Sequence, residues 1–356
     1  MSDDPQMALV NRLFEASLGT GEVFTVYLGD RLGFYRALLD GAMTAGELAG
    51  TAETDERATR EWLEQQAVAG ILDVDDVSAP PEQRRFSLPE ANAEALTDPD
   101  SPYSIAPLCR SFAAIGTTLP KILDAFRTGK GVEWEDYGRD MTEAQGDFNR
   151  PWLRGSLATE YLPSIPDIHE RLSAGATVAD VACGVGWAGI SIAQAYPNVT
   201  VDGFDLDEPS ITLARVNAAE AGVADRVNHS VEDVGDLLLD GVYDLAIVVE
   251  AIHDLSAPVE VLDSIRRMLT AGGTLIVADE KTEDAFTAPG SETERLFYTY
   301  SVLCCLISAQ VDDPTAATGT LMRRSTFEGY AKEAGFSSVE VLPIEHDFLR
   351  FYRLTP

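Results

Sequence analysis

"VADVACGVGWAG", residues 178–189, is the stretch that decides the fold. It carries a G-x-G-x-x-G pattern at Gly184, Gly186 and Gly189, directly after a run of apolar residues. Glycines in this pattern let the chain turn sharply at the end of a strand and let its backbone approach a ligand closely. The pattern alone is typical of sites that bind the pyrophosphate of a dinucleotide. The same stretch also places a carboxylate, Asp180, at the expected end of the strand.

Short β-rich runs alternate with helical stretches from about residue 175 onward. The runs are ATVADVA (176–182), VTVDGFD (199–205), RVNHSV (226–231), YDLAIVV (243–249), GGTLIVADE (272–280), VEVLPI (339–344) and FLRFYRL (348–354). Strands separated by helices predict a doubly wound, mostly parallel sheet, here with seven strands. Too few residues join the last two runs for a crossover helix, so we expect them to pair antiparallel, as a hairpin at the end of the sheet. The predicted fold class is therefore α/β.

The part of the chain before the sheet is expected to be α-helical. Apolar spacing predicts two opening helices, and Thr44 and Thr54 are suitable N-caps for two shorter helices that follow. A polar, hairpin-like stretch comes next, and this order of elements is typical of a winged helix. The longer of the two short helices, residues 55–70, has no basic stripe, whereas DNA recognition needs a clustered positive face. We therefore expect residues 1–102 to form a winged-helix-like dimerisation domain that binds no nucleic acid.

The charge balance is extreme: 59 acidic side chains stand against 26 basic ones, which gives a net charge of −33. A field of this sign repels nucleic-acid backbones and anionic membrane surfaces. No apolar run approaches the roughly 20 residues that cross a bilayer, and the first residues lack the basic start and apolar run of a signal peptide. The four cysteines have neither the spacing of a disulfide framework nor that of a zinc site. We therefore expect a cytoplasmic protein with no metal site, no membrane partner and no nucleic-acid partner.

Charge also separates the two ligand classes that use such a glycine loop. Asp205 ends the second strand and can accept hydrogen bonds from both hydroxyls of an adenosine ribose. An acid after the third strand, Glu232 or Asp233, can accept a hydrogen bond from the adenine amino group. A carboxylate inside the loop would repel a pyrophosphate, whereas S-adenosylmethionine carries no phosphate but an ammonium and a sulfonium, so these acids favour it. For Asp180 the alternative is a structural role, in which its carboxylate accepts hydrogen bonds from neighbouring backbone amides.

The motifs VADVACGVG, VDGFDLD, VEDV and GGTLIVADE, in this order and at these spacings, resemble those of class I S-adenosylmethionine-dependent methyltransferases. The resemblance covers about residues 170–356 and implies that residues 166–356 form a catalytic domain with the class I methyltransferase fold. It also implies that S-adenosylmethionine contacts Asp180, Ala182, Gly184, Gly186, Asp205, Leu206, Glu232, Asp233, Val234 and Glu250. Ala182 stands where the family usually has a glycine, and alanine costs little there if its φ is negative.

With its helical front end, the chain also resembles bacterial small-molecule methyltransferases and plant-type O-methyltransferases, in which the front domain serves dimerisation. In the plant-type enzymes the histidine of an HDW motif is the general base, and His253, followed by Asp254, stands at that position. An imidazole with a pKa near 6.5 can take a proton from an attacking hydroxyl. Asp279 stands where this family has a glutamate that orients the base, whereas its second flanking glutamate is absent near Leu321 or Met322. The alternative role for His253 is to cap the following helix.

Two segments can cover an acceptor at the carboxyl ends of the strands, where open α/β sheets bind their ligands. One is residues 136–155, within a helical connector and pocket wall at residues 103–165, and the other is residues 292–310, which contain Phe297 and Tyr298. An apolar, aromatic cover suits a flat apolar acceptor. We therefore expect a homodimeric enzyme that methylates a small molecule, an aromatic one included, at a hydroxyl oxygen. The sequence leaves four alternatives: an N- or C-methyltransferase working by proximity, a nicotinamide dehydrogenase, a DNA-binding regulator that binds S-adenosylmethionine, and a non-catalytic scaffold.

Overall fold

The computed structural model describes residues 5–356. The chain forms two compact units, of which one ends at Gly116 and the other begins at Thr117, inside α6 (Ala106–Thr128). Each unit has its own apolar core. Among residues 5–356, no helix combines the length and the apolar character that crossing a membrane requires.

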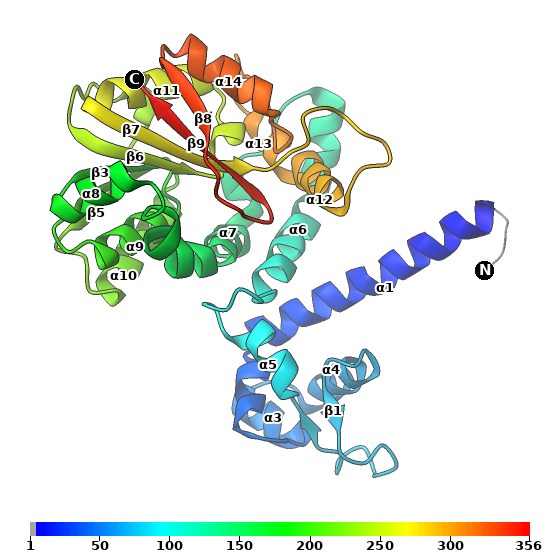
Figure 1. The fold of residues 1–356 in the computed structure, drawn as a ribbon. Helices are drawn as coiled ribbons and strands as arrows, with labels where there is room; N and C mark the ends of the chain where they lie inside the picture. The colour runs from blue at the N-terminus through cyan, green and yellow to red at the C-terminus, as the bar shows by residue number, and fades with distance from the viewer. Residues whose placement is uncertain (1–4) are drawn as a thin grey trace. The chain divides into compact units, whose positions relative to one another are not determined.

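The first unit consists of helices followed by a small hairpin (Figure 1). Its elements are α1 (Pro5–Arg31), α2 (Phe34–Ala37), η1 (Leu38–Asp40), α3 (Ala45–Ala52), α4 (Glu56–Val68), β1 (Asp73–Val74), β2 (Phe86–Ser87) and α5 (Glu90–Thr97). Strands β1 and β2 pair antiparallel, so the short helices and the hairpin occur in the predicted order. Trp62 lies at the centre of this unit, with its ring centroid 4.7 Å from that of Phe34 and 5.3 Å from that of Tyr35.

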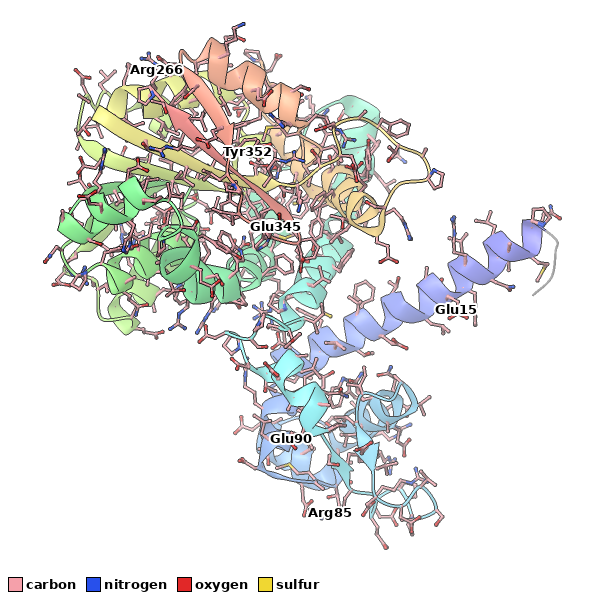
Figure 2. All side chains as sticks on the ribbon, in the orientation of Figure 1. Glu15, Arg85, Glu90, Arg266, Glu345 and Tyr352 are labelled. Carbon is pink, nitrogen blue, oxygen red and sulfur yellow. The ribbon has the colours of Figure 1, made fainter. Side chains whose placement is uncertain are left out.

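Local hydrogen bonds explain where the two short helices begin. Thr44 caps α3, and it forms a capping box with Glu47, as its sequence position predicts. The expectation that Thr54 caps α4 is wrong, because Asp55 Oδ1 accepts the hydrogen bond from the Ala58 amide at 2.8 Å. Arg85, labelled in Figure 2, lies just before β2 and pairs with Glu47 at 2.9 Å. The positive charge of Arg85 is therefore already paired with an acidic side chain of the same unit.

The second unit is built on a seven-stranded sheet with the order β5-β4-β3-β6-β7-β9-β8. The strands are β3 (Thr177–Val181), β4 (Thr200–Asp205), β5 (Val227–Val231), β6 (Tyr243–Val249), β7 (Leu269–Glu280), β8 (Ser338–Val341) and β9 (Leu349–Thr355). The first five pair in parallel, whereas β9 pairs antiparallel with both β7 and β8. The predicted doubly wound sheet with an antiparallel hairpin at its end is therefore confirmed.

Helices cover both faces of this sheet (Figure 1). They are α7 (Gly138–Trp152), α8 (Pro166–Ala174), α9 (Trp187–Ala195), α10 (Glu208–Glu220), α11 (Pro258–Met268), α12 (Glu292–Tyr300), α13 (Leu306–Ala309) and α14 (Arg324–Glu333), with the shorter turns η2 (Trp134–Tyr137), η3 (Leu153–Tyr161), η4 (Val234–Asp236), η5 (Ile252–Asp254) and η6 (Ser301–Cys305). The cores on the two faces include fully buried side chains such as Ile190 of α9 and Leu262 of α11. Burial of such a side chain contributes about 1.5 to 3 kcal/mol. The parallel strands end at one edge, where the loops after them meet.

Candidate active site

The loop between β3 and α9 has an unusual backbone. Ala182, Gly184 and Gly186 have φ values of 53°, 51° and 85°. A Cβ atom at Gly186 would lie 2.6 Å from His229 Nε2, so the loop packs too closely there for any side chain. The expectation of a negative φ at Ala182 is wrong, and this alanine stores backbone strain in the left-handed region. The loop therefore holds a tight turn that leads directly into the N-terminus of α9.

Two carboxylates, the buried Asp180 and the half-buried Asp205, accept hydrogen bonds from backbone amides of this loop and of α9. Asp180 Oδ2 accepts a hydrogen bond from the Gly189 amide at 2.8 Å, and burial raises the pKa of Asp180 to about 7. Asp205 Oδ2 accepts one from the Gly184 amide at 2.8 Å, and its Oδ1 accepts one from the Asp207 amide at 2.9 Å. Burial also raises the pKa of Asp205. Asp180 therefore bonds a backbone amide of α9, and Asp205 joins the end of β4 to the glycine loop.

The other positions assigned to the cofactor lie around the ends of β4 and β5. Leu206 is 67% exposed, whereas Val234 is buried. Asp233 Oδ1 accepts a hydrogen bond from the Gly235 amide at 2.8 Å, and the Glu232 amide donates to the Asp205 carbonyl at 3.1 Å. The ends of β4 and β5 are thus tied together, with an apolar surface and exposed acids beside the glycine loop.

Helix α7 contributes residues to this region that sequence reasoning missed. Glu250 has a φ of 48°, and its Oε2 accepts hydrogen bonds from Gln145 Nε2 and Asn149 Nδ2, each at 2.8 Å. Burial raises the pKa of Glu250. A Cβ at Gly146 would lie 2.2 Å from the side chain of Val185, so α7 packs directly on the glycine loop. The spacing of Gln145 and Asn149, four residues apart on one helix face, is the signal that could have paired them.

His253 follows β6 and lies among three carboxylates. Its Nδ1 is 2.8 Å from Asp279 Oδ1 and 2.9 Å from Glu280 Oε2, and its Nε2 is 3.3 Å from Asp254 Oδ1. Burial alone would lower the pKa of His253, but the charges of Asp254, Glu280 and Asp279 outweigh it and raise this pKa well above 6.5. The expected pKa near 6.5 is therefore wrong, because the sequence does not show that three carboxylates converge on the ring.

The cap alternative for His253 is also wrong. Helix α11 begins after Ala257 and has no side chain bonded at its N-cap. Another histidine, His346, lies in the last hairpin and has a structural role. Its Nδ1 accepts hydrogen bonds from the amides of Phe348 and Leu349 at 3.2 and 3.1 Å. His253 and Asp279 are thus the histidine and the acid that the structure brings together, 26 residues apart in the sequence.

Glu280 is the residue of this cluster that sequence reasoning missed. Adjacent residues of a strand point to opposite faces, so Asp279 and Glu280 are not expected to reach the same ring. Glu280 is the last residue of β7, where the regular pleat ends. Two carboxylates from neighbouring positions therefore meet the same nitrogen of His253.

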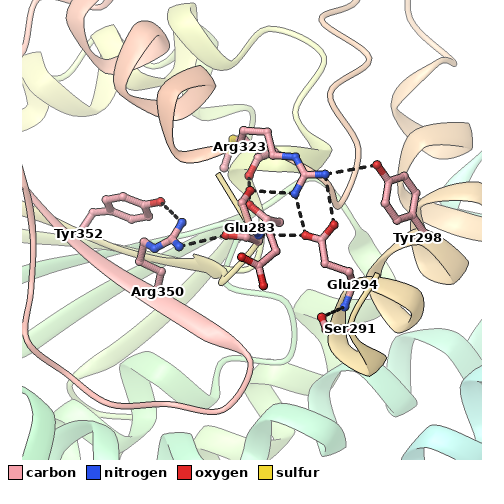
Figure 3. Close-up of polar contacts among 9 residues, drawn as sticks. Glu283, Ser291, Glu294, Tyr298, Arg323, Arg350 and Tyr352 are labelled. Carbon is pink, nitrogen blue, oxygen red and sulfur yellow. Dashed lines mark hydrogen bonds and ion pairs between the residues drawn. The ribbon is translucent and has the colours of Figure 1, made fainter. Parts of the chain in front are cut away.

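A polar network holds the segment between β7 and α12 (Figure 3). Arg323 Nη1 donates to Glu294 Oε1 at 2.6 Å and to the Glu283 carbonyl at 2.8 Å, and its Nη2 donates to the Tyr298 hydroxyl at 3.2 Å. Ser291 caps α12 through the Glu294 amide. A surface pocket of about 380 Å³ borders this network and is lined by residues that include Tyr298. The ion pair between Arg323 and Glu294 thus fixes the first turn of the helix that was expected to cover the acceptor.

Comparison with known proteins agrees with this geometry. Residues 172–322 match a family model described as a methyltransferase domain. A stretch of 113 residues is 31% identical to the ubiquinone biosynthesis O-methyltransferase of Pseudomonas paraeruginosa, and it covers 31% of this chain and 47% of that protein. The chain thus spans about half the length of the curated relatives that it matches.

Solved structures show the same fold. Mitomycin 7-O-methyltransferase MmcR is 21% identical with a TM-score of 0.70, covering 98% of each chain. Human N-acetylserotonin methyltransferase, solved in complex with S-adenosylmethionine, is 16% identical with a TM-score of 0.70, covering 99% of this chain and 98% of that one. Residues 172–322 thus match the methyltransferase domain model, and the chain has the fold of these solved methyltransferase structures.

Proposed function

We propose that the chain transfers a methyl group from S-adenosylmethionine to a hydroxyl oxygen of a small molecule. The observation that carries this proposal is the position of two polar clusters at one edge of the sheet: Asp205 with the glycine loop after β3 and β4, and His253 with Asp279 after β6 and β7. In the reaction the acceptor oxygen attacks the methyl carbon. The new carbon–oxygen bond forms as the carbon–sulfur bond breaks, S-adenosylhomocysteine leaves, and the hydroxyl proton passes to a base.

The charges around the glycine loop support S-adenosylmethionine as the cofactor. Asp205 Oδ2 accepts from the Gly184 amide of the loop and Oδ1 from the Asp207 amide, so a lone pair of each oxygen remains to accept a ribose hydroxyl. The exposed side chain of Leu206 would offer an apolar surface to the adenine, and the exposed Asp233 would accept a hydrogen bond from the adenine amino group. Glu250 adds a carboxylate for the ammonium of the methionine part. A pyrophosphate would bring further negative charge to these acids.

His253 is the proposed general base. Asp279 bonds Nδ1 at 2.8 Å and thereby fixes the ring, while Nε2 points to the side of Asp254, which is 36% exposed. Only the neutral imidazole accepts a proton, and the raised pKa of His253 moves that form to higher pH. The remainder of the catalysis is positioning, because the sulfonium is already a good leaving group.

One observation favours a second candidate, an amine acceptor. Asp254, Asp279 and Glu280 surround a single histidine, so this side of the site is rich in negative charge. An amine attacks as its free base and needs no proton acceptor in the methyl-transfer step. Incubation with S-adenosylmethionine and a panel of phenols and matched anilines, followed by mass spectrometry, distinguishes the two. Methylated phenols support the proposal, whereas methylation of the anilines alone contradicts it.

The first unit is proposed to be a winged-helix dimerisation domain. Helix α1 exposes apolar side chains along most of its length: Met7, Leu9, Val10, Leu13, Phe14, Leu18, Phe24 and Leu28 are each at least 40% exposed. An exposed apolar surface of this extent is typical of a site that another protein chain covers. A second copy of the chain would bury it, and the acidic surface opposes nucleic acid as the partner.

A further inference from the structure

His253, Asp254 and Cys305 bring a nitrogen, an oxygen and a sulfur donor together beside the proposed base. Their donor atoms all lie within 4.8 Å of one another. We propose that these three side chains form a binding site for a thiophilic divalent cation of the Zn²⁺ class, and that the bound cation inhibits methyl transfer. The inhibitory effect rests on the proposed role of His253 as base, whereas binding of the cation does not.

The donor set matches the ligands that zinc prefers. Zinc sites combine histidine nitrogen, cysteine sulfur and carboxylate oxygen at about 2.0 to 2.3 Å, and three protein ligands leave a fourth position open. Donors as close as these can meet one ion after small rotations of their side chains. Asp254 is 36% exposed while His253 is 2% exposed, so a cation can enter from solvent through Asp254 and reach the buried ring.

A second feature typical of a metal site is the hydrogen-bond partner of the other ring nitrogen of His253. Metal-bound histidines almost always donate the opposite N–H to a carboxylate or carbonyl, which fixes the tautomer and raises the basicity of the ligand. His253 Nδ1 is hydrogen-bonded to Asp279 Oδ1 at 2.8 Å. A second group of donors, formed by His253, Asp279 and Glu280, would use this same Nδ1. Since Nδ1 is already bonded, Nε2 is the nitrogen that faces the cation.

The charge of the cluster also favours a cation. Asp254, Asp279 and Glu280 carry three negative charges when ionised, and His253 supplies one positive charge at most. Buried charge without compensation is costly. In addition, Asp254 Oδ1 and Glu280 Oε2 are buried and lie 3.3 and 2.9 Å from the ring nitrogens of His253, and the buried Asp279 Oδ2 has no hydrogen-bond partner among the described residues. A divalent cation would balance the surplus charge of these carboxylates.

The sequence did not predict this site because Cys305 is far along the chain from the adjacent ligands His253 and Asp254. Cys305 ends the π-helical turn η6, an insertion of a kind often found at functional sites. Its neighbour Cys304 is buried at 3% exposure but does not belong to the group of donors. The two adjacent cysteines thus provide a matched pair, in which one is proposed to be a ligand and the other is not.

Binding of the cation and of a proton to His253 exclude each other, because both use the lone pair of Nε2. Zn²⁺ should therefore inhibit methyl transfer, and the inhibition should weaken as acid protonates the ring. Cofactor binding should be unaffected, since the glycine loop and Asp205 contribute no ligand. The Cys305→Ser variant should need at least about tenfold more Zn²⁺ for half inhibition of its own activity, a loss typical of a weakened metal site.

Titration with Co²⁺ tests the site directly, with absorption spectroscopy as the readout. The wild-type chain and Cys304→Ser should show a thiolate-to-cobalt charge-transfer band that saturates at an equimolar ratio, and Zn²⁺ should abolish it. Cys305→Ser should lose the charge-transfer band, and Asp254→Asn should bind Co²⁺ more weakly. Circular dichroism should show that each variant is folded, and Cys305→Ala replaces Cys305→Ser if the latter is not.

Two results would overturn the site: a wild-type chain without the charge-transfer band, or a band that Cys305→Ser and Cys305→Ala both retain. Calorimetry with S-adenosylhomocysteine on the same samples separates this proposal from the proposed function. S-adenosylhomocysteine binding without the cobalt band contradicts the cation site alone. A cobalt band without S-adenosylhomocysteine binding supports the site and contradicts the methyltransferase proposal.

Discussion

Asp205 accepts a hydrogen bond from the backbone amide of Gly184 at 2.8 Å, which joins the end of β4 to the glycine loop after β3. The carboxylate proposed to hold the ribose therefore also holds the loop proposed to surround the rest of the nucleoside. Since desolvation of the half-buried Asp205 raises its pKa, its charge is only partly compensated by the amides it bonds. Ribose hydroxyls would add the donors that this carboxylate lacks.

Ala182→Gly should stabilise the chain. Ala182 has a φ of 53°, and a non-glycine residue in the left-handed region costs about 1 to 2 kcal/mol, part of which the greater freedom of glycine in the unfolded state offsets. We expect the free energy of unfolding to rise by about 0.5 to 1 kcal/mol in urea denaturation. The control is Ala179→Gly in the adjacent strand, which should destabilise. A destabilised Ala182→Gly variant would show that the loop is not strained at this position.

Asp180 should make stability depend on pH. Its pKa is raised to about 7 by burial in the folded chain, whereas an unfolded aspartate has a pKa near 3.9. The protonated form is favoured by folding, so this contribution is fully present below pH 4 and is lost as pH rises to 7. The wild-type chain should lose up to about 4 kcal/mol of stability over this range through Asp180, at about 1.4 kcal/mol per pKa unit.

Asp180→Asn provides the comparison, because an amide oxygen can still accept the hydrogen bond from Gly189. The difference in unfolding free energy between this variant and the wild type should grow in favour of the variant from pH 4 to pH 7. Denaturation at several pH values measures it. Parallel curves for the two chains would mean that Asp180 is ionised throughout and that burial does not control its pKa.

His253→Ala should lower kcat by about 10² to 10⁴ and leave the affinity for S-adenosylhomocysteine nearly unchanged, because the ring is proposed to act only in proton transfer. The rate of the wild type should rise with pH through an apparent pKa above 6.5, since the carboxylates stabilise the imidazolium. In Asp279→Asn the rise of the rate should move to lower pH, because one of the carboxylates that stabilise the imidazolium is gone. His346→Ala is the matched control and should keep its kcat. Retention of more than about a third of kcat in His253→Ala would exclude it as the base.

Charged substitutions on α1 should dissociate the proposed homodimer. Leu13 and Phe14 are 54% and 62% exposed, and lysine at both positions would prevent burial of this surface against a second chain. We expect the wild type to sediment as a dimer and the Leu13→Lys/Phe14→Lys variant as a monomer. The control is Glu15→Lys, which alters charge on the same helix without removing apolar surface. A monomeric wild type would contradict the proposed role of the first unit.

The sheet could be predicted from the sequence because its signals are local. The run from Val178 to Val181 and the glycines after it define a strand and a turn within a few residues. The antiparallel pairing of β8 with β9 followed from the short connection between these last two strands. The cap of α4 was assigned to Thr54 instead of Asp55, because both side chains can cap and only the start of the helix distinguishes them.

The electrostatics of the site could not be predicted in the same way. His253 and Asp279 were paired through the resemblance to a known family, but the approach of Glu280 depends on how β7 ends, and that of Cys305 on the π-helical turn. The hydrogen bonds from Gln145 and Asn149 to Glu250 depend on the packing of α7 against the loop. Each of these contacts is set by tertiary packing between segments far apart in the chain.

Calorimetric titration with S-adenosylhomocysteine, with NAD as the comparison ligand, tests the central claim most directly. The account predicts micromolar binding of S-adenosylhomocysteine, about −8 kcal/mol, and no binding of NAD. Asp205→Ala should weaken the binding of S-adenosylhomocysteine by about 2 to 4 kcal/mol, since two hydrogen bonds to a charged acceptor are lost. The control variant Asp225→Ala, at an exposed position, should bind S-adenosylhomocysteine as the wild type does. Binding of NAD without binding of S-adenosylhomocysteine would contradict the account.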